Sequence, residues 1–219
     1  LKARLGELPA EPATGFVGRS RELLALERLL RRERYAVVRG QGGEGKTALA
    51  AELARWMVRS QQIRRAAFVS VEGIETNIVE SALDRLGHQL VKENFSTQLD
   101  CGGDLERAEM EIARVLAEQS TLLVVDNVES ILLPPFMESQ TPEALSEEAR
   151  RELDAILGLC ARLSAKADTR IVFTSREALP APFDAQRHRR ELHRMDREDA
   201  VKLVERVLNY EAAVANTET

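Results

Sequence analysis

The sequence lacks the features that mark disulfide-bonded, zinc-held and membrane-spanning proteins. Among 219 residues there are two cysteines, Cys101 and Cys160, and they form no Cys-x-x-Cys pair. They fit neither a disulfide framework nor a zinc site, so we expect ordinary buried or loop thiols in a reducing cytosol. The longest apolar runs, such as 122–125 and 131–133, fall far short of the roughly 20 residues that cross a bilayer.

A signal peptide, an internal repeat and an excess of positive charge are also missing. Lys+Arg 31 against Asp+Glu 36 gives a formal net charge of −5. A protein that binds nucleic acid along its whole surface is usually basic, so we expect no nucleic-acid partner beyond a local patch, and no membrane. These absences favour a cytoplasmic protein. The chain begins at Leu1 rather than methionine, which indicates a piece of a longer protein.

Short apolar runs typical of buried strands alternate with helical patterns along the chain. We expect strands at 35–38, 66–71, 121–125, 170–174 and, weakly, 190–192. Helices are expected from an N-cap at Ser20, at 46–59, 77–93 and 105–118, from about Thr141, and from a capping box at Asp196 and Asp199. The stretches 94–103 and 127–140 are expected to be irregular. This alternation predicts an α/β fold with a parallel sheet covered on both faces.

Residues 40–47, Gly-Gln-Gly-Gly-Glu-Gly-Lys-Thr, match the P-loop pattern between an expected strand and an expected helix. Its glycines allow positive φ and bring several N–H groups toward one point, which makes a nest for an anion. The following helix directs its positive end at the same point. Lys46 would contact the β- and γ-phosphates, and the Thr47 hydroxyl would bind Mg²⁺.

A dinucleotide fingerprint is a competing interpretation of the same glycines. Gly40, Gly42 and Gly45 also satisfy Gly-x-Gly-x-x-Gly, and Glu72 follows the second expected strand as a ribose-binding acid would. Lys46 and Thr47 have no role in that fingerprint, and a second phosphate-handling motif lies downstream. We therefore favour the P-loop.

That second motif is the apolar strand 121–125, which ends in Asp126. A carboxylate at the carboxyl end of a parallel strand lies where ligands gather, and there it can hold the water shell of the magnesium opposite Thr47. Many ATPases place a second acid directly after this aspartate to polarise the attacking water, but this chain has Asn127. Glu129 is the nearest candidate for that task, and a solvated loop acid is the alternative.

Two further segments carry candidate residues. The strand at 170–174 ends in Thr174-Ser175-Arg176, where Thr174 would sense the γ-phosphate or water and Arg176 would neutralise charge during phosphoryl transfer. Before the first helix, Phe16-Val17-Gly18-Arg19 offers either a flat apolar contact for a base or simple packing of that helix onto the core.

These four segments, in this order, resemble the nucleotide-binding domain of the signal-transduction ATPases with numerous domains (STAND), which include the NB-ARC proteins and many bacterial regulators. The resemblance covers roughly residues 16–208 and includes Glu22 after the Gly-Arg pair. It implies a three-layer P-loop NTPase sandwich with a five-stranded parallel sheet of order 5-1-4-3-2. It divides the chain into an arm at 1–15, a nucleotide-binding domain at 16–193 and the start of a helical lid at 194–219.

The resemblance implies a switch that binds ATP or ADP with Mg²⁺ and hydrolyses ATP slowly, with ATP favouring a homo-oligomer and other domains of the full-length protein as partners. Phe16, Val17 and Arg19 would lie on the adenine side. The expected catalytic residues are Lys46, Asp126, Glu129 and Arg176, and the expected metal ligands are Thr47 and Asp126. The expected nucleotide contacts are Phe16, Val17, Gly18, Arg19, Gln41, Gly42, Gly43, Glu44, Gly45, Lys46, Thr47, Ala48, Thr174 and Arg176.

Two other functions stay open. Asn127 and the short lid favour a module that holds ADP or ATP structurally with little turnover. Basic clusters at 31–34 and 187–190 favour an AAA+-type ATPase associated with nucleic acid, although a solvated helix face and loop explain them as well. The apolar segment Ile131–Met137 either packs over the core or forms a partner surface near the nucleotide, and exposure of Phe136 would distinguish the two.

Overall fold

A computed structural model describes residues 5–74, 77–132 and 147–215 of the chain. Five parallel strands form one sheet: β1 (Tyr35–Arg39), β2 (Arg65–Ser70), β3 (Thr121–Asp126), β4 (Thr169–Ser175) and β5 (Arg189–Glu191). Their order is β2-β3-β4-β1-β5, which is the expected 5-1-4-3-2 read from the other edge. The predicted α/β fold and strand order are confirmed.

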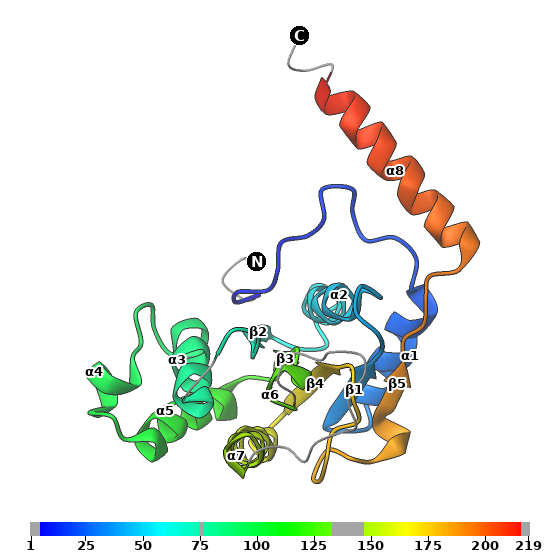
Figure 1. Cartoon of the computed structure of the whole chain (residues 1–219). Helices are drawn as coiled ribbons and strands as arrows, with labels where there is room; N and C mark the ends of the chain where they lie inside the picture. Colours follow the sequence, from blue (N-terminus) through cyan, green and yellow to red (C-terminus); the bar gives the residue numbers. More distant parts are fainter. Residues whose placement is uncertain (1–4, 75–76, 133–146, 216–219) are drawn as a thin grey trace.

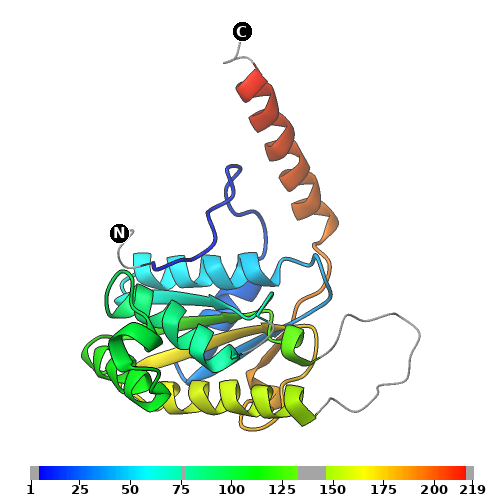
Figure 2. The ribbon, with the colours of Figure 1, turned by 60° about the vertical axis from the view of Figure 1, so that its left-hand side comes forward.

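Helices cover both faces of this sheet (Figures 1 and 2). One face carries α1 (Ser20–Leu30) and α2 (Lys46–Arg59), and the other carries α3 (Ile78–Leu90), α5 (Leu105–Glu118) and α7 (Glu147–Ser164). Neighbouring strand residues serve opposite cores: Ala36 and Val38 pack with α1 and α2, whereas Val37 packs with the other layer. This period of two is the reason that uninterrupted apolar strands are buried on both sides.

The remaining elements are α4 (Thr97–Cys101), α6 (Glu129–Leu132), the 3₁₀ turn η2 (Gln186–His188) and α8 (Arg197–Ala215). α8 projects away from the sandwich in Figures 1 and 2, and several of its apolar side chains are exposed. Among the described helices none is both long and apolar enough to cross a membrane.

Several local predictions differ from the structure. The stretches 94–103 and 127–140 contain the short helices α4 and α6, which four or five residues of helical period could not reveal. Ser20 is the first helical residue rather than the N-cap, because Arg19 occupies the capping position with φ 59° and gives no side-chain cap. The predicted start of the helix at Thr141 and the side chain of Phe136 lie outside the described residues.

Helical spacing predicts that Leu49, Leu53, Trp56 and Met57 share one buried stripe of α2, and Trp56 departs from it. Leu49, Leu53 and Met57 of α2 are buried as expected, but Trp56 is 42% exposed, and its Nε1–H donates to Glu27 of α1 at 2.8 Å. Both cysteines are free and buried, as predicted, and burial raises the pKa of the Cys160 thiol to about 12. At the start of α8, the backbone N–H of Asp199 donates to the carboxylate of Asp196 at 2.9 Å, which is one half of the predicted capping box.

Candidate functional site

The loop between β1 and α2 wraps around an open backbone cradle. Gly43 and Gly45 have φ of 78° and 86°, and a Cβ at either would meet nothing within 4 Å, so their backbone faces open space. The Gly40 N–H donates to the Ser175 carbonyl at 3.2 Å, and the Gln41 N–H donates to the Glu44 carboxylate at 2.6 Å. The loop is therefore held in shape by its own side chain and by the end of β4. Its amide groups fit an anion the size of a phosphate.

Lys46 begins α2 and folds back over this loop. Its Nζ donates to the carbonyls of Gly40 at 2.8 Å and Gln41 at 3.1 Å, and it lies 3.9 Å from the Glu129 carboxylate. The ammonium group is largely buried. A buried cation beside the backbone of a glycine loop favours an anionic ligand.

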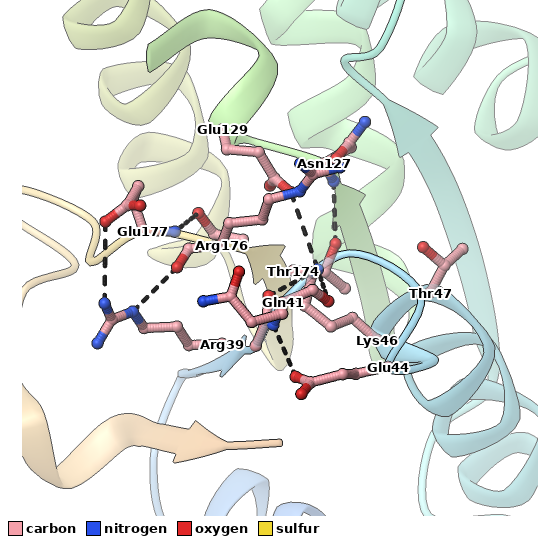
Figure 3. Close-up of polar contacts among 12 residues, drawn as sticks. Arg39, Gln41, Glu44, Lys46, Thr47, Asn127, Glu129, Thr174, Arg176 and Glu177 are labelled. Carbon is pink, nitrogen blue, oxygen red and sulfur yellow. Dashed lines mark hydrogen bonds and ion pairs between the residues drawn. The ribbon is translucent and has the colours of Figure 1, made fainter. Parts of the chain in front are cut away.

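The carboxyl ends of β3 and β4 meet this loop at one edge of the sheet. The hydroxyls of Thr47 and Thr174 both donate to Asp126 Oδ1, at 2.8 and 2.6 Å. Asn127 has φ 63°, a left-handed conformation that asparagine tolerates, and its N–H donates to the Thr174 hydroxyl at 2.9 Å. This bend leads directly into α6, whose first residue, Glu129, is buried and faces Lys46 (Figure 3). The solvated-loop alternative for Glu129 is therefore wrong.

Arg176 follows β4 and lies across the glycine loop. Its Nε is 3.3 Å from Glu129 Oε1 (Figure 3). Its guanidinium would be 3.3 Å from a Cβ at Gly42. A side chain at position 42 would thus displace this arginine.

A cavity of about 530 Å³ adjoins the loop. Predicted nucleotide contacts line one side of it: Phe16, Val17, Arg19, Gly42, Gly43, Glu44, Gly45 and Ala48. Gly18 lies outside it and packs against α8, where a Cβ would come within 2.6 Å of the Asp199 carboxylate. The other side comes from the segment after β5 and from α8: Arg194, Met195, Ala200, Leu203 and Val204. Apolar spacing predicts a helix through Ala200, Leu203 and Val204, but the sequence carries no signal for what those residues face.

Arg19 forms hydrogen bonds to three segments around the cavity. Its Nη1 donates to Glu22 at 3.0 Å, and its Nη2 donates to the carbonyls of Glu44, at 3.2 Å, and His193. The side chain is largely buried, so the guanidinium holds the P-loop, the start of α1 and the segment before α8 at fixed distances.

Magnesium fits the donor set, although within the described ranges no three His, Cys, Asp or Glu side chains gather as a metal cage. Mg²⁺ bound to nucleotides takes only one or two protein ligands beside phosphate oxygens and water. Thr47 Oγ1 and the buried Asp126 carboxylate provide two oxygens 2.8 Å apart beside the cradle.

Sheet order excludes the dinucleotide alternative. That fingerprint needs the second strand beside the first, so that an acid at its end reaches the ribose. Here β3 and β4 lie between β1 and β2. Glu72 follows β2, which is an edge strand two positions removed from β4 and three from β1, and its side chain is exposed.

No protein-family model and no curated protein matches the chain. Solved structures do. A Walker-type ATPase of Pyrococcus abyssi aligns with TM-score 0.60 at 11% identity, over 93% of this chain and 61% of its own. The ORC1 protein of Aeropyrum pernix, solved in complex with DNA, aligns with TM-score 0.58 at 16% identity, over 89% and 50%. Domain III of the Thermotoga maritima replication initiation protein DnaA aligns with TM-score 0.57 at 16% identity, over 93% and 77%.

At these identities the likeness establishes the fold, which is that of P-loop NTPases. The chain spans less than two thirds of the length of several solved chains that it resembles, among them the Walker-type ATPase at 61% and the ORC1 protein at 50%. The STAND resemblance finds no specific support among them.

Proposed function

We propose that this chain is a Mg²⁺-dependent ATP-binding module that hydrolyses ATP. The observation that carries the proposal is the convergence of Thr47 and Asp126, 2.8 Å apart, beside a glycine loop that Lys46 covers. Phosphates would be bound by the loop amides and Lys46, and Thr47 with Asp126 would hold the metal, which supplies charge neutralisation at the transferring phosphoryl group. The cavity bounded by Phe16, Met195 and Leu203 would take the base.

Isothermal titration of the 219-residue chain with Mg-ATP and Mg-ADP tests binding. We expect heat from both nucleotides and none after Lys46→Ala, because the substitution removes the charge beside the cradle. Lys166→Ala is a matched control, since Lys166 is exposed before the amino end of β4 and far from the site. Equal titration curves for the wild type and Lys46→Ala would refute the proposal.

Turnover separates an enzyme from a structural nucleotide holder. If the chain hydrolyses ATP, phosphate release should disappear in Asp126→Asn and fall strongly in Glu129→Gln. Absence of phosphate release from a wild-type chain that binds Mg-ATP would favour the structural holder.

Two kinds of ATPase are candidates for the more specific function. The sequence motifs favour a STAND-type switch in which ATP promotes oligomerisation. The fold neighbours, which include a replication initiator domain and an ORC1 protein, favour an AAA+-type ATPase instead. No family model supports the STAND motif resemblance, whereas the solved neighbours share the fold of this chain. We therefore place the AAA+-type ATPase before the STAND-type switch.

The AAA+-type ATPase would have a nucleic acid as its partner. From the sequence we expect no such partner beyond a local patch, and this expectation remains a prediction. The first basic cluster lies directly before β1, and the second spans η2 and the first two residues of β5. Several of their arginines are already paired: Arg31 with Glu27, Arg187 with Glu33, and Arg34 with the Ala167 carbonyl. A salt-sensitive increase of ATPase rate on adding DNA or RNA would support the partner, and an unchanged rate would speak against it.

A further inference from the structure

Glu129 is a buried carboxylate that two cations share. Its side chain is 9% exposed, and its Oε1 lies 3.3 Å from Arg176 Nε and 3.9 Å from Lys46 Nζ. Neither carboxylate oxygen accepts a hydrogen bond from the described residues. The ion pairs are therefore long, and no hydrogen bond adds to them. Because no hydrogen bond reinforces these ion pairs, an anion that offers Lys46 and Arg176 both charge and hydrogen bonds can compete with Glu129 for them.

The two acids of the site have different partners. Asp126 accepts hydrogen bonds from the hydroxyls of Thr47 and Thr174 and, within the described ranges, forms no ion pair. Among the described residues, the charged groups that face Glu129 are Lys46 and Arg176. The acid assigned to the metal is thus kept apart from the positive charges, and the other acid opposes the charges that phosphates would use.

Lys46 and Arg176 can both change partners without unfolding the site. Lys46 uses two of its three donors on the carbonyls of Gly40 and Gln41, which leaves one for either Glu129 or a phosphate. The side chain of Arg176 is 56% exposed and lies over Gly42, so its guanidinium can turn from Glu129 toward the cradle.

We infer that Glu129 competes with the terminal phosphate of ATP for Lys46 and Arg176, and so sets how strongly the site prefers a triphosphate to a diphosphate. This inference rests on the proposed ATP-binding function. A γ-phosphate takes both cations from Glu129 and frees its oxygens to orient a water molecule. ADP, which is one phosphate shorter, leaves Arg176 on Glu129.

The test compares Glu129→Gln with a matched control, Glu177→Gln. Glu177 lies next to Arg176 in sequence, but its carboxylate faces Arg39 at 3.8 Å rather than the cradle. Affinities are measured by isothermal titration with Mg-AMPPNP, a non-hydrolysable ATP analogue, and with Mg-ADP. Removing a carboxylate charge beside the phosphate should tighten AMPPNP binding of Glu129→Gln about tenfold, and ADP binding less. The control should bind both as the wild type does.

A purely water-orienting role for Glu129 predicts a different result: ATP turnover falls while both affinities stay at wild-type values. That outcome, or weaker binding of AMPPNP, overturns the inference and leaves the proposed function standing. A wild-type chain that binds neither nucleotide refutes the proposed function itself.

Two further variants keep the test decisive if Glu129→Gln folds poorly, as judged by circular dichroism. Glu129→Asp retains the charge but withdraws it from Arg176, so a smaller gain of the same sign is expected. In an Arg176→Gln background the gain from Glu129→Gln should shrink, because one of the shared cations is gone. Equal gains in both backgrounds contradict competition for Arg176.

Discussion

One hydroxyl, that of Thr174, joins three parts of the candidate site. It donates to Asp126 Oδ1 at 2.6 Å and accepts from the Asn127 N–H at 2.9 Å, and the side chain is 1% exposed. It therefore fixes the carboxylate assigned to magnesium and the bend that turns the chain toward Glu129. Its predicted contact with the γ-phosphate stays a prediction, since both of these bonds stay within the protein.

Replacing Thr174 with valine should destabilise the fold by about 1–3 kcal/mol, because the buried Asp126 oxygen and the Asn127 N–H each lose a partner. Urea unfolding followed by circular dichroism measures the loss. Thr169→Val is the matched control: Thr169 is also buried in β4, but its hydroxyl has no hydrogen-bond partner among the described residues. That substitution should be neutral or stabilising, and equal losses in the two variants would contradict the assignment.

At the scale of elements, packing decides the effect of two glycines with the same helical propensity. Gly87 in α3 lies under the ring of Phe95, which a Cβ would approach to 2.0 Å. Gly158 in α7 has only the end of the Arg162 side chain near its Cβ position, at 3.3 Å. A glycine inside a helix costs roughly 0.5–1 kcal/mol relative to alanine, and that gain is available only where the new methyl group fits.

We therefore expect Gly158→Ala to stabilise the chain by roughly 0.5 kcal/mol, and Gly87→Ala to destabilise it by about 1–3 kcal/mol through overpacking against Phe95. Thermal and urea unfolding of both variants measure this. Stabilisation by Gly87→Ala would show that α3 and Phe95 do not pack as described.

Helices α1 and α2 are joined by a titratable contact. Burial raises the pKa of Glu27, but hydrogen bonds from Trp56 and Gln62 and the charge of Arg31 outweigh it, so the pKa lies below its ordinary value of 4.5. A group whose pKa is lower in the folded state stabilises the fold above its unfolded pKa. This contribution is lost as the pH falls from about 4.5 through the folded pKa.

The stability difference between the wild type and Glu27→Gln should accordingly be largest near neutral pH and shrink below about pH 4.5. Trp56 is the single tryptophan and its indole donates to Glu27, so its fluorescence reports the same titration. Urea unfolding at several pH values measures the first effect. A difference that grows on acidification would reverse the assigned sign.

At the scale of the whole molecule, the features that the sequence predicted correctly are those that depend on a few neighbouring residues. Continuous apolar strands, the glycine loop and the aspartate that ends β3 each follow from a few adjacent residues. The loop and the aspartate meet at the carboxyl ends of the strands, as the P-loop interpretation requires. The strand order came from the family resemblance and is confirmed, since residue patterns alone do not order parallel strands.

Long-range contacts were beyond the sequence. Periodicity placed Trp56 with the core residues of α2, but it could not reveal Glu27 on the neighbouring helix. Gln89 of α3 uses its amide to bind both the N–H and the carbonyl of Phe68, and so covers the free edge of β2. Likewise, Leu203 and Val204 line the cavity beside the P-loop from the far end of the chain. Such partners depend on tertiary packing and leave no spacing to read.

The bonds of Arg19 have a mechanical consequence. One guanidinium connects the backbone of Glu44, in the turn after β1, with the backbone of His193, four residues before α8. A displacement of either backbone must therefore stretch or break a bond to the other. The segment before α8 and the glycine turn are thus linked to each other. Because α8 is long and projects from the sandwich, a small rotation at its first residues moves its last residues through a larger distance.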